Sequence, residues 1–546
     1  MAEIIRGVNL GGWLVLERYI APSLFAVTSC DVDGPRPQNA HHTDNTHNPD
    51  DHNNSCTPVL PYPVDQLSLV SAFASKSLAR EYLTSHWDTF VTEADIVQIK
   101  AAKVKNVRVP IGHWILDPVL DDDASPWVPG EWPYLIRLLG WCKKHSINVW
   151  LDLHTAPGSQ NGFDNSGQTL AKPTGLGWSN SVENVNSTLD VIAAICEEIK
   201  KDPNSDIVKG FGLLNEPFKA ENEAVVKDFD QRGLQVVRSI LGEDVTVYIG
   251  DMFDAQRFQA DRFWGEEKYH NTLLDSHYYH VFAATPRSFS PRQHIAYVCE
   301  KNTRDLNSCC WDSDSSDAVR SEGMGRMMGE WSASFDTLVC DKLDDVMKSY
   351  ETGGEILAFY REIGDKRKAF LRNFVEAQMV AWEGGGVGWF YWNFKMEGGA
   401  FAEWDFLRGV REGWIPTLEP SVRAEDAFGT CESIIFKTDD SMDIVDTFPD
   451  PTKLAPDWQS VEADDDVVVS HGQSLGLTQP SMESRSRTPL LSPLPAPLHD
   501  YPSKGLMIGA LCAVGFAVFA AKIVRSRQSR FNSGVYARIP EAEIKV

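Results

Sequence analysis

The sequence predicts an α/β protein, more specifically a (β/α)8 TIM barrel, and two observations lead to this prediction. Eight short apolar or β-branched runs recur within residues 1–437, as expected for buried parallel strands. Amphipathic helical patterns separate these runs, and strands that alternate with helices predict parallel pairing through crossover connections. No glycine-rich dinucleotide fingerprint follows the first run, which disfavours a Rossmann fold.

The predicted strands differ in length but share a core of apolar or β-branched residues. They are IIRGVNL (4–10), NVRVPI (106–111), INVWLDLH (147–154), IVKGFGLLNE (207–216), VTVYIGD (245–251), TLLDSHYYH (272–280), MMGEWS (327–332) and VGWFYWNF (387–394). Helical patterns between them include residues 92–104, 133–146 and 187–201. The spacing of their apolar residues is typical of helices with one buried face.

The carboxyl ends of the strands are where a barrel of this kind carries its functional groups. In this sequence those ends form a ring of polar and aromatic side chains. The ring consists of Arg108 in the second strand, Asp152 and His154 in the third, Asn215 and Glu216 in the fourth, His277 and Tyr279 in the sixth, Glu330 in the seventh and Trp392 in the eighth. One such residue would be ordinary, but packing does not explain a complete ring.

Two of these residues, Glu216 and Glu330, predict a retaining glycosidase site. Strands four and seven face each other across the barrel mouth, so the carboxyls can reach the separation of about 5–5.5 Å that double displacement requires. We expect Glu330 to be the nucleophile and Glu216 the acid/base. Arg108 and Tyr279 would stabilise ionised Glu330. No metal, nucleotide or flavin is implied, because two carboxyls suffice.

The remaining groups of the ring suit a sugar-binding pocket. Asn215 can bind the 2-hydroxyl of the sugar, a contact that strengthens in the transition state. His154 and His277 can bind hydroxyls or orient the carboxyls, although either could be a core histidine. Trp392 offers a flat floor for a sugar ring, or core packing. The net charge of -26 makes nucleic acid an unsuitable partner.

Seven stretches that contain these residues resemble the fungal exo-β-1,3-glucanases of glycoside hydrolase family 5. They are RGVNLGGWLVLERYIAPSLF, NVRVPIGHWIL, DLHTAPGSQNGFDNSG, GLLNEP, DSHYYHVF, GEWSAS and GWFYWNFKME, and they span Arg6 to Pro416 in the order of the family. A single stretch such as NEP is weak evidence, whereas seven in register are highly specific. The resemblance implies a TIM barrel that removes glucose from β-1,3-glucan with retention.

The resemblance also implies a role for each site residue. Glu216 would be the acid/base and Glu330 the nucleophile. Arg108, His154, Asn215, His277, Tyr279 and Trp392 would line the −1 subsite. Glu17 would bind the terminal glucose, Phe163 and Phe282 would clamp the +1 sugar, and Asp164 and Asn165 would contact glucose hydroxyls.

This chain departs from the family pattern at several positions. Arg18 stands where the family usually has Pro, and Thr155 stands where Gly is common. A polar insertion, residues 31–56, follows the first strand and could reshape the pocket on the mouth side. The insertion therefore leaves exo and endo action open. The alternatives to removal of glucose from β-1,3-glucan are a β-1,6-glucanase, a glycolipid β-glucosidase, a transglucosylase, or a glucan-binding protein without catalysis.

The polar insertion contains four histidines among aspartates and asparagines: His41, His42, His47 and His52. A metal site is conceivable there, but a solvated loop closed by a Cys30–Cys56 disulfide fits the composition better. Cys142 and Cys196 lie in apolar helical patterns and are expected to be free and buried. Further cysteines lie in loop-like stretches where disulfides could form: Cys299, Cys309, Cys310, Cys340 and Cys431.

The region after the barrel predicts a membrane anchor. Residues 438–503 are acidic and rich in Pro and Ser, which indicates a disordered linker. Residues 504–524 form an apolar run long enough for a transmembrane helix, and the tail 525–546 is basic at its start. The positive-inside tendency places the tail in the cytoplasm and the barrel outside or in a lumen.

The chain begins without a signal peptide. We expect a missing start or an unconventional insertion to explain this, and a tail-anchored protein with a cytosolic barrel is the alternative. The expected partners are β-glucan and the lipid bilayer, and we expect a monomer.

Overall fold

The computed structural model describes residues 4–33, 56–117, 125–171, 177–218, 222–255, 270–282, 284–301, 325–336 and 339–440. Several predictions lie outside these residues. They concern the four histidines of the insertion, almost all of the linker, the transmembrane helix 504–524 and the tail 525–546. Among the helices of the described ranges, none combines the length and the apolar character needed to cross a bilayer.

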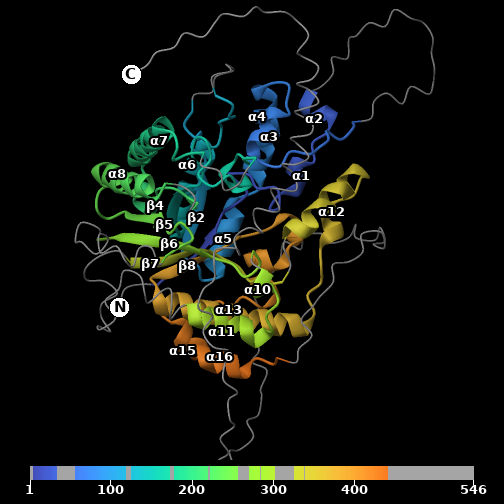
Figure 1. The fold of residues 1–546 in the computed structure, drawn as a ribbon, viewed down its shortest axis with the longest axis vertical. Coiled ribbons are helices and arrows are strands. Elements are labelled where there is room, and N and C mark those ends of the chain that lie inside the picture. Colours follow the sequence, from blue (N-terminus) through green and yellow to red (C-terminus); the bar gives the residue numbers. More distant parts are fainter. Residues whose placement is uncertain are drawn as a thin grey trace, which may run out of the picture.

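Eight parallel strands close into a barrel in chain order, which confirms the predicted (β/α)8 architecture (Figure 1). The strands are β1 (Ile5–Asn9), β2 (Asn106–Ile111), β3 (Asn148–Leu153), β4 (Val208–Gly212), β5 (Thr246–Gly250), β6 (Thr272–Tyr278), β7 (Gly325–Trp331) and β8 (Gly388–Tyr391). The ring closes because β1 pairs with both β2 and β8. Several strands were predicted too long, most of all β4, which ends at Gly212, four residues before Glu216.

Large side chains fill the lower part of the barrel interior. Trp150, Tyr248 and Phe390 form a buried cluster with Leu273 and Met327, one residue from each of five strands. Neighbouring strands must leave room for them. At Gly210 of β4, a Cβ atom would lie 2.0 Å from the Trp150 ring, so only glycine fits there. The interior is therefore a packed core, and the pocket can open only above it.

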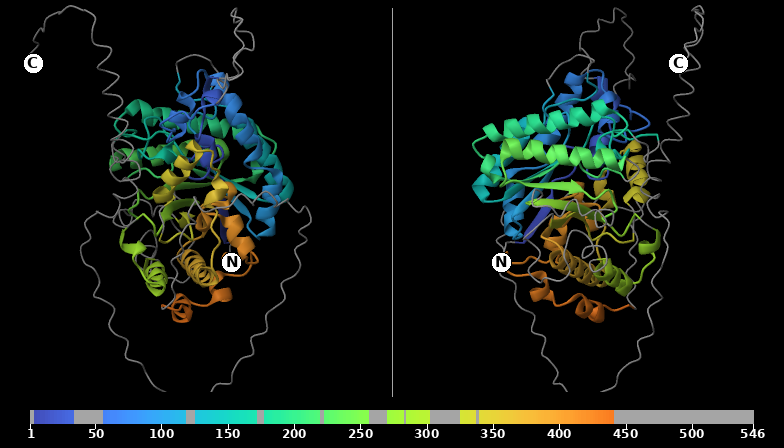
Figure 2. Two further views of the ribbon diagram at one scale, coloured as in Figure 1. Left: turned by 90° about the vertical axis from the view of Figure 1, so that its right-hand side faces the viewer. Right: turned by 60° about the vertical axis from the view of Figure 1, so that its left-hand side comes forward.

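The helices surround the barrel (Figures 1 and 2). They are α1 (Pro22–Phe25), α2 (Ser29–Asp33), α3 (Gln66–Ser71), α4 (Lys76–Thr89), α5 (Glu93–Ala101), α6 (Trp132–His145), α7 (Val182–Lys201), α8 (Glu223–Leu241), α10 (Ala284–Arg287), α11 (Pro291–Lys301), α12 (Val339–Glu351), α13 (Asp365–Gly385), α14 (Phe406–Glu412), α15 (Ala424–Phe428) and α16 (Cys431–Lys437). The helical patterns predicted over 92–104, 133–146 and 187–201 correspond to α5, α6 and α7. Helices α7 and α8 lie side by side on one flank, and α11 packs with α13 and α16 on another (Figure 1).

Helix α7 shows how the sequence determines such an element. Ser181 caps its amino end by accepting a hydrogen bond from the backbone N–H of Asn184. Its buried side chains recur at helical spacing and include Val185, Ile192 and Ile199. One face of the helix is therefore held against the barrel while the other faces solvent.

Two disulfides hold peripheral segments in place. Cys30–Cys56 closes the polar insertion, as predicted. Cys299–Cys431 joins α11 to the first residue of α16, so these two cysteines lie in helices and not in the loops expected from the sequence. The second bridge encloses a separation of 132 residues and ties the last described helix to the barrel wall. Cys142 and Cys196 are free and buried, which confirms the prediction for both.

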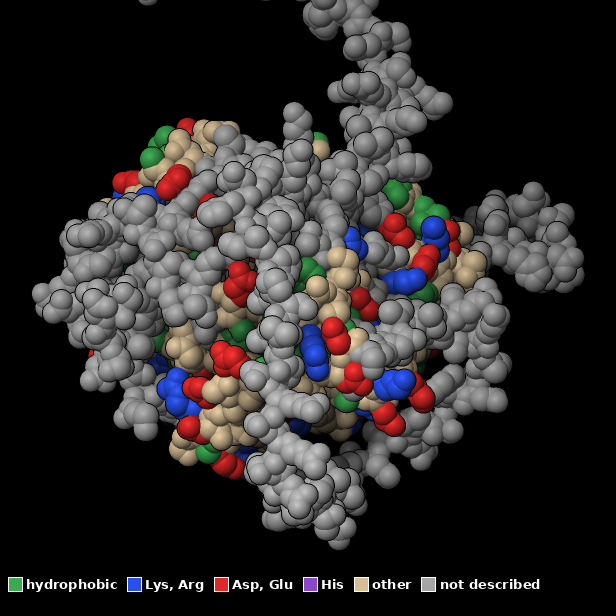
Figure 3. Space-filling model, turned by 60° about the horizontal axis from the view of Figure 1, so that its bottom comes forward, with side chains coloured by type: hydrophobic (Ala, Val, Ile, Leu, Met, Phe, Trp, Pro, Cys, Tyr) green, Lys and Arg blue, Asp and Glu red, His purple; other side chains and the backbone are tan. Residues whose placement is uncertain are grey.

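Charges are mixed on the part of the surface that can be described. On the face drawn in Figure 3, acidic side chains are spread among basic and polar ones and no basic patch is gathered. With the net charge of -26, the described part of this face does not favour binding of a phosphate backbone.

Candidate active site

The acid/base candidate Glu216 lies on a short extension beyond β4. The backbone N–H groups of Leu213 and Asn215 still donate to the carbonyls of Tyr248 and Leu153, so the extension stays attached to the neighbouring strands. At Glu216 itself φ is +48°, in the left-handed region that non-glycine residues rarely adopt. Such local strain persists where the surrounding structure imposes it, often at functional sites.

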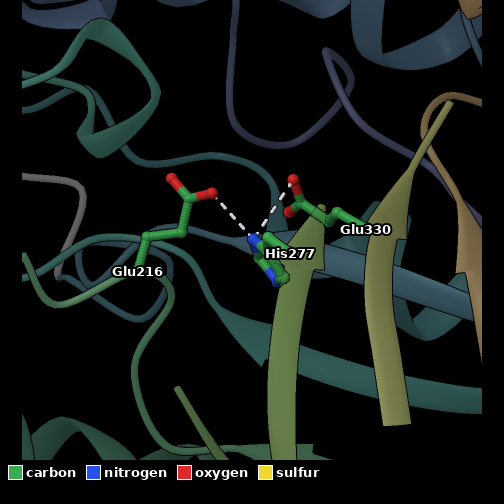
Figure 4. A group of neighbouring side chains, drawn as sticks. All are labelled: Glu216, His277 and Glu330. Carbon is green, nitrogen blue, oxygen red and sulfur yellow. Dashed lines mark hydrogen bonds and ion pairs between the residues drawn. The ribbon is translucent and has the colours of Figure 1, made fainter. Parts of the chain in front are cut away.

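The second carboxylate, that of Glu330, comes from β7 and approaches the first. Glu216 and Glu330 point toward each other across the barrel mouth, with the His277 ring between them (Figure 4). One oxygen of each carboxylate and one ring nitrogen of His277 all lie within 4.8 Å of one another. Their side chains are 10% and 5% exposed, respectively. This separation suits the double displacement of a retaining glycosidase.

A register shift between β6 and β7 places His277 opposite Glu330. The pairing of β6 with β7 changes between Ser276 and His277, so that His277 aligns with Glu330. The Nδ1 atom of His277 lies 2.7 Å from Oε1 of Glu216 and 3.4 Å from Oε2 of Glu330. Burial opposes a charge on this ring, but the negative charges of Glu330 and Asp275 outweigh it and hold the pKa of His277 well above its usual 6.5.

The two glutamates have pKa values displaced in opposite directions. Burial would raise the pKa of Glu216, but the hydrogen bond with His277 and the charge of that ring bring it below its ordinary value. Burial raises the pKa of Glu330 above its ordinary value, against the opposing charges of His277 and Arg108. The charge of Arg108 therefore favours the ionised form of Glu330, as expected, but it does not cancel the rise in the pKa of Glu330 that burial causes. The opposite directions of the Glu216 and His277 pKa values favour a proton on His277 over one on Glu216.

Arg108 connects four strands beneath the carboxylates. Its Nη1 atom donates to Oε1 of Glu330 and to Oδ1 of Asn9, at 2.9 Å each. Its Nη2 atom donates to Oδ1 of Asn215 at 2.8 Å and lies 3.0 Å from Asp152. The guanidinium is fully buried, and both of its Nη atoms make these contacts. Arg108 therefore fixes the positions of Glu330 and Asn215 together.

Three further predicted residues surround the carboxylates. The hydroxyl of Tyr279 donates to Oε2 of Glu330 at 2.8 Å. The His154 ring bonds Asp152 through Nδ1 at 2.5 Å and stacks on Trp392, with 5.7 Å between ring centroids. The Trp392 indole N–H donates to the hydroxyl of Tyr19. All three side chains therefore lie where the sequence placed them, at the barrel mouth.

Glu17 is buried beside these groups and has an unused acceptor. Its Oε1 atom has no hydrogen-bond partner among the described residues. Burial holds the pKa of Glu17 well above its usual range, and the negative charges of Asp164, Glu330 and Glu216 raise it further. A buried, unpaired acceptor of this kind is satisfied when a ligand hydroxyl reaches it.

The residues expected at the entrance occupy different surroundings. Asn165 donates from Nδ2 to Oε2 of Glu216 at 2.8 Å, so it contacts the acid/base candidate directly. Asp164 is next to it, and burial raises the pKa of Asp164 while the charge of Arg18 lowers it. Phe163 packs edge-on against Phe218.

The second ring expected to form the clamp comes from another segment. Phe282 is 37% exposed and packs edge-on against Tyr279. Phe163 and Phe282 thus have separate neighbours at the rim of the site.

The sequence reasoning missed three residues that touch the site. Asn9 pairs in register with Arg108 and accepts from it. Tyr19 bonds Trp392. Asp275 lies 3.4 Å from His277 through Oδ2 and Nε2. A signal for Asp275 was present, because Asp275, His277 and Tyr279 alternate along one strand and so share a face.

The same three side chains that lie at the centre could offer ligand atoms to a cation. Glu216, His277 and Glu330 provide two oxygens and one nitrogen. The Nδ1 atom of His277 already bonds Glu216 at 2.7 Å, so a cation would have to displace that contact. The contact between His277 and Glu216 suits the transfer of a proton, so the grouping of these three side chains does not require a cation.

Comparisons with known proteins agree with this geometry. Residues 71–395 match the family described as Cellulase (glycosyl hydrolase family 5). The glucan 1,3-beta-glucosidase of Yarrowia lipolytica is 34% identical over 428 residues, which cover 76% of this chain and 89% of the relative. Glucan 1,3-beta-glucosidase I/II of Saccharomyces cerevisiae is 32% identical, covering 76% and 86%.

A comparison of folds points the same way. The crystal structure of rutinosidase from Aspergillus niger superposes with a TM-score of 0.54 at 17% identity, covering 76% of this chain and 98% of that one. At this identity the similarity supports the barrel fold alone. The sequence match and the two relatives extend over most of the barrel. This chain therefore belongs to glycosyl hydrolase family 5.

Proposed function

We propose that this protein is a retaining β-glucosidase that removes glucose from β-1,3-glucan. The observation that carries the proposal is the approach of the Glu216 and Glu330 carboxylates to within 4.8 Å across one pocket. The substrate follows from the relatives of Yarrowia lipolytica and Saccharomyces cerevisiae, which are glucan 1,3-beta-glucosidases. The chain covers 89% and 86% of these two relatives, so the proposal concerns the whole barrel.

In the proposed mechanism, Glu330 attacks the anomeric carbon while Glu216 protonates the departing oxygen. The covalent glucosyl–Glu330 ester is then hydrolysed by a water molecule that Glu216 deprotonates. Two inversions leave the β configuration unchanged. The Arg108 and Tyr279 contacts orient Glu330 for the attack, with one hydrogen bond to each oxygen.

The remaining contacts suit the recognition of one glucose unit. Asn215, held by Arg108, presents its amide to the 2-hydroxyl position. Glu17 has an unpaired acceptor for a further hydroxyl, and Trp392 supplies an aromatic floor. We propose that Phe163 and Phe282 hold the next sugar at the entrance, and that Asp164 and Asn165 contact hydroxyls near it. Removal of single glucose units is then the expected mode of action.

Product analysis tests this proposal. The full chain is incubated with reduced linear β-1,3- and β-1,6-gluco-oligosaccharides, and the products are followed by chromatography and proton NMR. We expect glucose as the first product from the β-1,3-linked substrate, released as the β-anomer. Oligosaccharides as first products would show endo action, the α-anomer would exclude the two-step mechanism, and binding without hydrolysis would exclude catalysis.

The pH dependence of turnover follows from the pKa directions. Activity requires an ionised Glu330 and one proton on the His277–Glu216 pair. Because the pKa of Glu330 is raised, the acid limb is expected above pH 4.5, with activity lost as the pH falls through it. Because the pKa of His277 is raised, the basic limb is expected well above pH 6.5. A profile of kcat/KM from pH 3 to 10 measures both limbs; a basic limb below pH 4.5 would show that Glu216 titrates without His277.

We also propose the domain arrangement that the sequence suggests. The catalytic domain spans residues 1–437, and a linker, a membrane helix at 504–524 and a cytoplasmic tail follow it. The two disulfides support a barrel outside the cell or in a lumen, because such bridges persist in oxidising compartments. Protease treatment of intact cells tests this arrangement. Cleavage of the barrel is expected if it lies outside the cell. A barrel in a lumen would be protected in intact cells and in sealed vesicles until detergent is added, whereas cleavage in sealed vesicles without detergent would favour the tail-anchored alternative.

A further inference from the structure

Asp275 lies beneath the catalytic pair and contacts neither carboxylate. Its Oδ2 atom lies 3.4 Å from Nε2 of His277, whose other nitrogen faces Glu216 at 2.7 Å. The three groups thus form a continuous row from the barrel interior to the acid/base candidate. The same oxygen lies 3.6 Å from the Nη2 atom of Arg108. Asp275 is 5% exposed, so its effect on His277 is not weakened by solvent.

The neighbouring strand is shaped to admit this carboxylate. A Cβ atom on Gly329, the residue before Glu330 in β7, would lie 1.9 Å from Oδ1 of Asp275. Any side chain at Gly329 would therefore displace Asp275. The register of β6 against β7 shifts between Ser276 and His277, and this shift aligns His277 with Glu330 above Asp275. The row depends on both features, and both involve Gly329 of β7, the residue that the pairing passes over.

We propose that Asp275 is a positioning residue that keeps a proton on Nε2 of His277, so that Nδ1 exchanges its proton only with Glu216. This inference rests on the proposed glycosidase function, because it explains how Glu216 obtains the proton that the leaving group needs. It does not make Asp275 a catalytic residue, because Asp275 contacts His277 and not the substrate. Its role resembles that of any buried carboxylate that selects one tautomer of an imidazole.

The proton balance of this arrangement closes over one turnover. In the empty site Nδ1 holds the shared proton and Glu216 is a carboxylate. Transfer along the 2.7 Å contact gives protonated Glu216 and a neutral ring with its remaining proton on Nε2 toward Asp275. Glu216 gives this proton to the glycosidic oxygen as the bond to the anomeric carbon breaks. The hydrolytic water returns a proton to Glu216, and transfer to Nδ1 restores the starting state.

Other charged groups face His277 but do not bond its Nε2 atom. They are Glu216 beyond β4, Glu330 of β7, Asp152 of β3 and Asp251 after β5. Arg108 of β2 lies against Glu330 and Asp275. Asp152 is occupied by His154 and Arg108. Glu216 and Glu330 meet the ring at Nδ1. Asp275 is therefore the group in the described site that can select the Nε2–H tautomer.

The test compares Asp275→Asn with the unchanged full chain. Asparagine keeps the size that Gly329 allows and removes the charge. With an alkyl β-glucoside, whose leaving group needs a proton, we expect kcat to fall at least tenfold, within the factor of about 10²–10⁴ that general acid catalysis supplies. With 2,4-dinitrophenyl β-glucoside, whose leaving group needs none, glucosylation is expected to change little. The basic limb of kcat/KM should move down by about one pH unit or more.

A second measurement does not depend on turnover. Nitrogen-15 NMR of histidine-labelled protein, assigned with His277→Gln, is expected to show His277 doubly protonated at pH 7 in the unchanged chain and neutral in Asp275→Asn. A ring that stays doubly protonated in Asp275→Asn, or that is neutral in the unchanged chain, would overturn the inference. If the chain hydrolyses no β-glucoside, the proposed function fails, while this spectrum still decides the effect of Asp275.

Two controls separate positioning from general damage. Asp251→Asn removes another buried carboxylate near the ring that does not bond Nε2, and it is expected to leave the basic limb in place. In the His277→Gln background, Asp275→Asn should add no further dependence on the leaving group, because both residues act through one ring. Additive effects in this double variant would show that Asp275 acts by another route.

Discussion

Replacing Glu330 with alanine is expected to lower kcat by roughly 10⁴- to 10⁶-fold, the range seen when a nucleophile is removed. The covalent intermediate cannot form without this carboxylate, which Arg108 and Tyr279 hold through one hydrogen bond to each oxygen. The barrel should remain folded, because the substitution leaves the backbone pairing of β7 with β6 and β8 unchanged. Turnover of a β-gluco-oligosaccharide and the thermal unfolding curve measure the two effects.

Azide makes this experiment specific for the role of Glu330. In Glu330→Ala, azide can enter the space that the carboxylate leaves and displace an activated leaving group from the opposite face. The expected product from 2,4-dinitrophenyl β-glucoside is α-glucosyl azide. Glu376→Ala is a matched control, since Glu376 is also a buried glutamate but lies on α13 with Arg372 and Lys437. Near-normal hydrolysis by Glu330→Ala, or equal losses in both variants, would contradict the nucleophile assignment.

Replacing Glu216 with alanine is expected to produce the second largest loss, and one that depends on the leaving group. For natural oligosaccharides, kcat should fall by about 10²–10⁴-fold, because the departing oxygen receives no proton. For a dinitrophenyl glucoside, formation of the glucosyl ester should change far less and the ester should accumulate. Pre-steady-state release of dinitrophenol, seen as a burst, measures this accumulation.

The product formed with azide distinguishes Glu216 from Glu330. In Glu216→Ala, azide attacks the ester from the face that water normally uses, so the expected product is β-glucosyl azide. Asn165→Ala serves as a comparison, because it removes a hydrogen bond to Glu216 while leaving the carboxylate. An α-glucosyl azide from Glu216→Ala, or equal losses with both kinds of leaving group, would show that the two roles are reversed or absent.

The opposed pKa shifts have a mechanistic meaning for both variants. A general acid is expected to have a raised pKa, yet the pKa of Glu216 is lowered because His277 donates to it. In the proposed mechanism we therefore expect the His277–Glu216 pair to serve as the acid and to titrate as a unit. Removing either member should weaken protonation of the leaving group, whereas removing Glu330 prevents the covalent step itself.

The sequence alone determined the architecture of the barrel. Apolar runs separated by amphipathic patterns identified all eight strands, because burial on both faces requires continuous apolar residues whatever their partners are. It also identified the catalytic candidates Glu216 and Glu330, because a charged side chain at the end of an apolar strand is costly to bury without polar partners. The membrane anchor at 504–524 and the insertion histidines stay predictions, since they lie outside the described residues.

Only the tertiary structure decided how these residues meet. The pattern extended β4 through Glu216, whereas the strand ends at Gly212 and a left-handed residue turns the carboxylate inward. The bonding of Cys299 with Cys431 and the row from Asp275 through His277 join segments whose separation in space no local pattern encodes. Strand formation depends on side chains a few residues apart, but distances and pKa values at the site depend on strands that only barrel closure brings together.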